Sequence, residues 1–164
     1  MKTITRFNIC VPMAAMLLTA ALAIPAAAQK QVPFKGALQG DEKQEPGLPG
    51  TVLAHGSVTG IASQFGRFKM TYDATVNVTD GSGVGTGQFV AANGDTISYT
   101  FNALAVPIDT ADTLNIVELS TITGGTGRFA GAKGSFILER LLNFVTGDTS
   151  GSFQGTITTP GPAY

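Results

Sequence analysis

Polar and apolar residues alternate regularly along most of this chain after about residue 50. The most regular stretch is Arg67–Val78, where every second residue is apolar: Phe68, Met70, Tyr72, Ala74, Val76 and Val78. A period of two over this length is typical of a β-strand with one buried face and one face in water. The stretch therefore predicts an amphipathic strand.

Turn signals separate further strand-length segments. Thr79–Gly83 is rich in turn residues, and Asn93-Gly94 is the signature of a tight β-hairpin. The other predicted strands are Val52–Ser63, Val84–Ala91, Thr96–Val106, Thr113–Thr123, Gly134–Asn143 and Gly151–Thr158, with a short edge strand at Phe34–Leu38. The chain therefore predicts about eight consecutive antiparallel strands.

The predicted fold class is all-β. After the N-terminal apolar run, no segment keeps a helical period over about ten residues, and the connections are too short for parallel crossovers. The alternatives are a β-sandwich and an eight-stranded antiparallel barrel. The barrel is favoured, because eight strands enclose an interior that side chains fill or that holds one small ligand.

An outer-membrane barrel is a competing interpretation, since alternation alone does not tell the inside of a barrel from its outside. An eight-stranded lumen is too narrow to stay empty, which favours an apolar interior. The chain also has no tryptophan for an aromatic girdle, and Pro160-Gly161-Pro162 is unsuited to a terminal membrane strand. We therefore expect no membrane insertion.

The first residues, to about Ala28, have the pattern of a secretory signal peptide. Lys2 and Arg6 precede an apolar run from Val11 to Ile24, and Ala26-Ala27-Ala28 matches a small-residue cleavage site. We expect cleavage near Ala28 and a secreted or periplasmic protein. Cleavage would also remove the single cysteine, so the exported chain is expected to have no disulfide.

Removal of residues 1–28 from the 164 leaves enough chain for one domain. Residues 29–50 include the charged run Asp41–Glu45, followed by proline and glycine, and we expect a flexible N-terminal segment with only the short strand. Residues 51–159 are expected to form the β-barrel domain and residues 160–164 a tail.

The composition limits the classes of partner and cofactor that we expect. Without Lys2 and Arg6, 8 of the 10 basic residues remain against 11 acidic ones, a net charge near −3 without a basic cluster, so nucleic acid is not an expected partner. With one histidine and no clustered carboxylates, no metal or cofactor is expected. The 21 glycines, about twice the usual share, are interpreted as turns and bulges.

A glycine-rich string, Gly-Gly-Thr-Gly-Arg-Phe-Ala-Gly-Ala-Lys-Gly-Ser-Phe, occupies residues 124–136. It lacks the spacing of a phosphate-binding loop, and no helix is expected after it. We interpret it as a wide turn in which glycines adopt positive φ and Arg128-Phe129 anchors the loop, with Gly131 and Gly134 bending the next strand.

This string, with Gln64–Phe68 and Phe89–Asp95, resembles small exported bacterial members of the allene oxide cyclase/dirigent-like β-barrel group. The resemblance covers about Val52 to Thr158. It implies an eight-stranded antiparallel barrel with a partly apolar cavity, often in a trimer. Members of the group include cyclases, proteins that orient radical coupling and proteins without an assigned activity, so the resemblance implies a fold rather than a function.

Four polar residues are candidates to line a ligand-binding cavity: Tyr72, Tyr99, Glu118 and Arg140. Each falls on the apolar face of its predicted strand. Glu118 and Arg140 are expected to pair with each other, to reach solvent at a barrel end, or to meet a polar group of a ligand. The tyrosines are expected mainly to fill the core, and His55 to face solvent.

Two functions fit these features. The favoured one is a binding or interaction module for a small hydrophobic ligand. The alternative is a cofactor-free cyclase or isomerase that uses Tyr72, Tyr99 or Glu118 to steer a small hydrophobic substrate.

The strand at Ser135–Leu142 is apolar on both faces, with Ile137 and Leu141 on the second one. A barrel strand needs only one buried face, so the N-terminal segment or another subunit is expected to cover these two residues. A homo-oligomer, such as a trimer, is therefore predicted.

Overall fold

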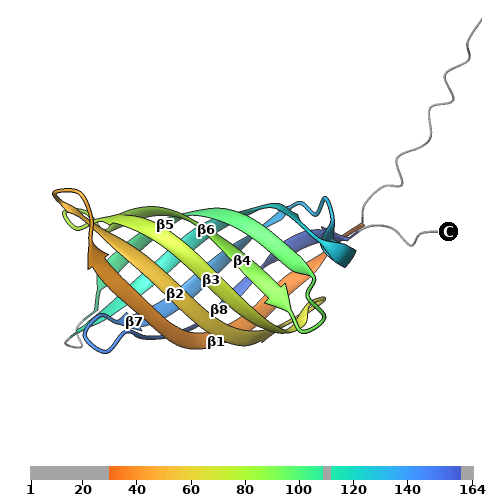
Figure 1. The fold of residues 1–164 in the computed structure, drawn as a ribbon, viewed down its shortest axis with the longest axis horizontal. Coiled ribbons are helices and arrows are strands. Elements are labelled where there is room, and N and C mark those ends of the chain that lie inside the picture. Colours follow the sequence, from red (N-terminus) through yellow and green to blue (C-terminus); the bar gives the residue numbers. More distant parts are fainter. Residues whose placement is uncertain (1–29, 109–111, 160–164) are drawn as a thin grey trace, which may run out of the picture.

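The computed structural model describes residues 30–108 and 112–159, which form a closed antiparallel barrel of eight strands in sequential order (Figure 1). The strands are β1 (Lys30–Pro46), β2 (Thr51–Ala62), β3 (Gly66–Asn77), β4 (Ser82–Ala91), β5 (Thr96–Pro107), β6 (Thr113–Gly125), β7 (Gly134–Asn143) and β8 (Asp148–Thr159). The predicted all-β barrel is confirmed. The predicted signal peptide and the tail at 160–164 lie outside the described residues.

We expected a flexible N-terminal segment with only a short strand at Phe34–Leu38. The structure instead has one long strand there, β1. It pairs with β2 on one side and closes the barrel against β8 on the other. Phe34, Leu38 and Glu42 point inward and are buried, whereas Asp41 and Lys43 face solvent. Two glycines and an inward-facing glutamate hide this alternation in the sequence, and hydrogen bonding along both edges outweighs the charged composition.

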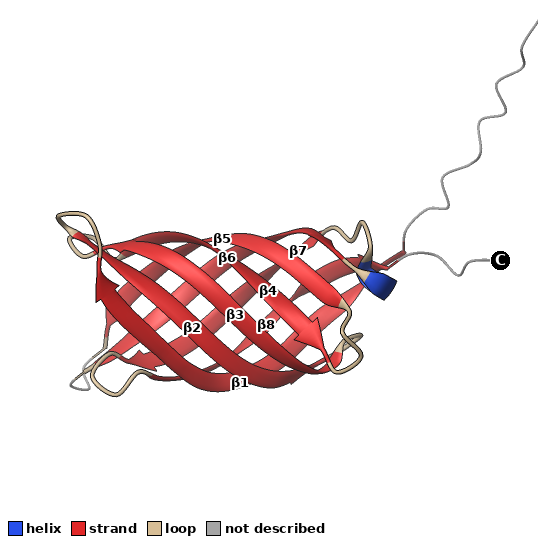
Figure 2. Ribbon diagram, in the orientation of Figure 1, coloured by secondary structure: helices blue, strands red, loops and turns tan. Residues whose placement is uncertain are grey.

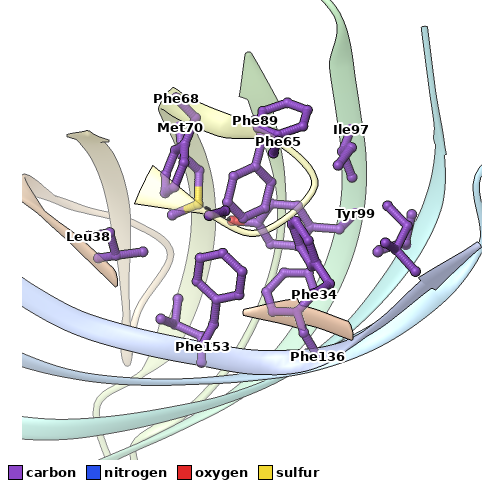
Figure 3. Close-up of a cluster of buried hydrophobic side chains, with 14 of the residues drawn as sticks. Phe34, Leu38, Phe65, Phe68, Met70, Phe89, Ile97, Tyr99, Phe136 and Phe153 are labelled. Atoms are coloured by element: carbon purple, nitrogen blue, oxygen red, sulfur yellow. Dashed lines mark hydrogen bonds between the residues drawn. The ribbon is translucent and has the colours of Figure 1, made fainter. Parts of the chain in front are cut away.

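Aromatic rings fill one half of the barrel interior (Figure 3). Phe34 lies 4.9 Å from Phe153 between ring centroids, and Tyr99 lies 5.1 Å from Phe136 in a T-shaped arrangement. Phe89 contacts both of these pairs. Such offset and edge-to-face contacts add to the stability gained by burying the rings.

Inward-facing glycines make room for these rings. Each of six aromatic residues has a glycine directly opposite it on a neighbouring strand: Phe68 and Gly60, Tyr72 and Gly56, Tyr99 and Gly87, Phe101 and Gly85, Phe136 and Gly155, Phe153 and Gly36. A Cβ atom at any of these glycines would overlap the side chain of its partner. The interpretation of the glycines as turns and bulges was therefore incomplete, because these six lie within strands.

The three segments that carry the family resemblance meet at one end of the barrel, where the short 3-10 helix η1 (Gly127–Phe129) lies (blue in Figure 2). The buried ring of Phe129 lies 5.0 Å from that of Phe65. The Asp95 carboxylate accepts hydrogen bonds from Asn93 and from Arg128 Nε, which hold the pKa of Asp95 below its usual range. These segments cover this end of the barrel, which we call the closed end.

The predicted wide turn is confirmed here, since Gly127, Gly131 and Gly134 all have positive φ.

Candidate functional site

Five polar residues gather in the half of the lumen away from the closed end. They come from five strands and are almost completely buried: Glu42 (β1), Tyr72 (β3), Glu118 (β6), Arg140 (β7) and Thr149 (β8). We call them the lumenal charge cluster. Three of the four predicted site residues, Tyr72, Glu118 and Arg140, are therefore brought together.

Arg140 is the centre of the cluster. Its Nε donates to Glu118 Oε1 at 2.7 Å, its Nη2 lies 2.9 Å from Glu42 Oε2, and its Nη1 donates to Thr149 Oγ1 at 3.2 Å. Tyr72 donates its hydroxyl to Glu42 Oε2 at 2.8 Å. The Arg140 guanidinium also lies over the Tyr72 ring, 4.9 Å from its centroid. Each of the three guanidinium nitrogens thus has a polar partner.

Sheet register explains this convergence. Arg140 pairs with Ile116, two residues before Glu118 on the same face of β6, so the two charged side chains are diagonal neighbours across adjacent strands. On its other side, Arg140 pairs with Gly151, whose missing Cβ leaves room for it. The cluster is therefore fixed by backbone pairing.

The cluster holds two carboxylic groups and one guanidinium away from water. Burial raises the pKa of Glu118, and Arg140 offsets only part of that effect. Burial by itself lowers the pKa of Arg140, but Glu118, Tyr72 and Glu42 outweigh it and raise that pKa. Arg140 is therefore always charged, and the protonated form of Glu118 is favoured by its burial.

Two buried polar atoms have no hydrogen-bond partner in the described part of the chain: Glu118 Oε2 and Ser120 Oγ. Both belong to inward-facing residues of β6. An unsatisfied buried polar group costs about 1–3 kcal/mol, and few buried polar groups in proteins lack a partner.

Beyond the cluster, the inward positions of β3 and β5 at the second end of the barrel carry small side chains. Ala74 and Val76 of β3 and Ala103 and Ala105 of β5 occupy inward positions and are only half-buried. We call these four residues the barrel mouth. The exposed Gln44 donates to Glu42 Oε1 at 2.9 Å, which connects the cluster to the solvent side.

Tyr99 is separate from the cluster. Its ring packs among the aromatic residues, and its hydroxyl donates to Met70 Sδ at 3.3 Å. Burial raises the pKa of Tyr99 well above its ordinary value, so it stays protonated. Core filling, the expected role of the tyrosines, describes this residue.

Sequence reasoning missed Glu42 and Thr149. Glu42 stands in a charged run that predicted irregular structure, although its spacing of four from Leu38 and eight from Phe34 was a signal of the same inward face. Thr149 lay outside the predicted last strand, Gly151–Thr158. The observed strand, β8, begins earlier, at Asp148.

One further polar residue considered in the sequence, His55, also lies outside the cluster. His55 faces solvent as predicted, with Nδ1 2.5 Å from Asp73 Oδ1. Within residues 30–108 and 112–159, no group of three metal-ligating side chains comes together, and no helix has the length and apolarity needed to cross a membrane.

Comparison with known proteins supports the fold. No protein-family model matches the chain, and no curated protein matches it. Among solved structures, a pterocarpan synthase dirigent protein matches with a TM-score of 0.60 and 14% sequence identity, over 93% of this chain and 100% of the other. The chain therefore has a dirigent-like eight-stranded β-barrel fold. At this identity the likeness concerns the fold alone.

Proposed function

We propose that this protein is a binding module that holds a small hydrophobic ligand in the barrel mouth, next to the lumenal charge cluster. The observation that carries the proposal is the half-buried state of four small apolar residues that point into the barrel directly beside a buried, charged group of side chains. The aromatic half of the lumen is filled, which leaves the mouth as the place for a ligand. Mouths of β-barrels are common sites for small molecules.

The chemistry of the mouth defines the ligand class. Ala74, Ala103 and the ring of Phe101 present apolar surface, and the polar groups lie to one side at Gln44 and Glu42. A ligand with an apolar body and one polar group fits this division. We also propose that the protein works after export, as the N-terminal residues predict.

A titration with the neutral fluorescent probe N-phenyl-1-naphthylamine tests this site. Ala103→Leu places a larger side chain in the mouth and is expected to weaken probe binding at least about tenfold, because one pocket-filling contact is worth roughly 1–3 kcal/mol. Asn102→Leu, the outward-facing neighbour, is the control and keeps wild-type affinity. Equal affinities for wild type and Ala103→Leu would overturn the proposal.

A second candidate is a cofactor-free isomerase or cyclase at the same place. It is favoured by Glu118, which has one unpartnered carboxyl oxygen and a raised pKa, as a group that takes a proton from a substrate carbon and returns one in an apolar site requires. The dirigent protein of similar fold is itself named as a synthase.

Exchange of the α-protons of 2-cyclohexenone with D₂O tests this activity. Wild-type protein is expected to accelerate the exchange, and Glu118→Gln to lose about 10²–10⁴-fold of that acceleration, the usual contribution of one acid–base group. If Glu118→Gln keeps the wild-type rate, the enzyme candidate is wrong.

We further propose self-association through the outer face of β5–β7. Leu119 and Ile137 lie opposite each other on this face, as do Leu104 and Val117, and Leu141 lies nearby. Four of them, Leu104, Leu119, Ile137 and Leu141, are 42–58% exposed. The expectation that the N-terminal segment covers Ile137 and Leu141 was wrong, because that segment forms β1; a second subunit is the remaining cover.

A further inference from the structure

A hollow of about 800 Å³ lies on the outer face of β1–β4, near the closed end. Two adjacent rungs of the sheet form it. Ala37, Ile61 and Arg67 stand side by side on one rung, and Thr59, Lys69 and Val90 on the next. All six are exposed on the outer face, so the hollow is separate from the barrel mouth.

The two cations of the hollow are free. Neither Arg67 nor Lys69 makes a hydrogen bond or an ion pair within the described residues, whereas Arg128 pairs with Asp95 and Arg140 with two carboxylic groups. None of the described residues that line the hollow is acidic. This local positive charge stands out in a chain whose net charge is −1.

From this combination we infer that the hollow binds a long-chain carboxylate. The carboxylate head lies between the Arg67 guanidinium and the Lys69 ammonium on β3, and the hydrocarbon chain extends over Ile61 on β2 and Ala37 on β1. A guanidinium matches the two oxygens of a carboxylate with parallel hydrogen bonds. The volume of the hollow falls in the range of small-molecule sites, about 300–1,000 Å³.

An extended anionic membrane fits this face less well than a single molecule. Asp41 and Asp73 are exposed on the same outer face, two residues beyond Gln39 on β1 and four beyond Lys69 on β3. They confine the positive charge to the hollow, and a sheet of negative headgroups would meet them as well.

NMR titration of the ¹⁵N-labelled protein with dodecanoate, below its micelle concentration, tests the inference. Backbone signals of Ala37, Ile61 and Lys69 are expected to shift. Lys69→Gln is expected to weaken binding roughly three- to fivefold, the factor that corresponds to one exposed ion pair. Lys43→Gln, which removes the same charge from an exposed position on β1 outside the hollow, keeps wild-type affinity.

Two further experiments distinguish binding of a single carboxylate from apolar binding and from binding to a membrane surface. Dodecanol, with the same chain and no charge, is expected to bind more weakly than dodecanoate. Phosphatidylglycerol vesicles are expected to retain no more protein than neutral vesicles. The inference is wrong if dodecanol and dodecanoate bind equally, if Lys43→Gln weakens binding as much as Lys69→Gln, if the shifts map to the barrel mouth, or if the protein binds vesicles but not monomeric dodecanoate.

Discussion

Arg140 donates from Nε to Glu118 Oε1 over 2.7 Å inside the barrel, whereas Oε2 of the same carboxyl group has no partner in the described part of the chain. The guanidinium is shared with Glu42, so two acidic groups compete for one positive charge. A proton on Glu118 would reduce the negative charge around the single Arg140 guanidinium. Because these charges are buried, the stability of the fold is expected to depend on the protonation of Glu118 and on the presence of Arg140.

Glu118 is expected to make the protein less stable as pH rises. Because the pKa of Glu118 is raised in the folded state, its stabilising effect is complete below the ordinary value of 4.5 and is lost as pH rises through the folded pKa. Glu118→Gln removes this dependence, so urea unfolding should show the variant gaining stability relative to wild type from pH 4 to pH 8. A constant difference, or one of opposite sign, would contradict the raised pKa.

Arg140→Met is expected to destabilise the fold strongly, by about 3–5 kcal/mol, because it removes the guanidinium that binds the buried carboxylic groups of both Glu42 and Glu118. Arg128→Met serves as the control, since the Arg128 side chain is 62% exposed and its pair with Asp95 is worth at most about 1 kcal/mol. Denaturant unfolding at pH 7 measures both. Similar losses for the two variants would show that the cluster has no special role in stability.

The glycines opposite aromatic rings give a prediction about packing. Gly87→Ala places a methyl group against the Tyr99 ring and is expected to cost about 1–3 kcal/mol through overpacking. Gly124→Ala is the matched control, because a Cβ atom there meets nothing within 4 Å. If both variants unfold at the wild-type denaturant concentration, the glycines do not make room for the rings.

Self-association has a direct test in light scattering. Ile137→Glu puts a charge in the centre of the exposed apolar face and is expected to convert an oligomer into a monomer. Thr71→Glu, an exposed outward position on β3, leaves the oligomer intact. A wild-type protein that is monomeric at 100 μM would rule out the proposed interface.

Much of the fold was predictable because period-two alternation is a local signal. Gly134–Asn143 matches β7 at both ends, and the bounds of Arg67–Val78 differ from those of β3 by one residue. Of β1, only Phe34–Leu38 was predicted, and the rest was missed for a physical reason. Its inward positions include Glu42, which is stabilised by partners on β3 and β7 that lie far away in the sequence.

The candidate site was predictable only in part. Glu118 and Arg140 stood out as charges on apolar faces, and their pairing is confirmed. Tyr72 and Tyr99 have the same strand pattern, yet one joins the cluster and the other the aromatic core. What separates them is their surroundings across the lumen, Glu42 for Tyr72 and Met70 for Tyr99, which alternation along a strand does not encode.

Methyl NMR of the protein with ¹³C-labelled alanine, titrated with N-phenyl-1-naphthylamine, tests the central proposal most directly. The methyl signals of Ala74, Ala103 and Ala105 are expected to shift in a saturable way, while those of Ala37 on the outer face and Ala132 at the closed end stay unchanged. Shifts confined to Ala37 or Ala132, or no saturable shift at the three mouth alanines, would contradict a ligand site in the barrel mouth.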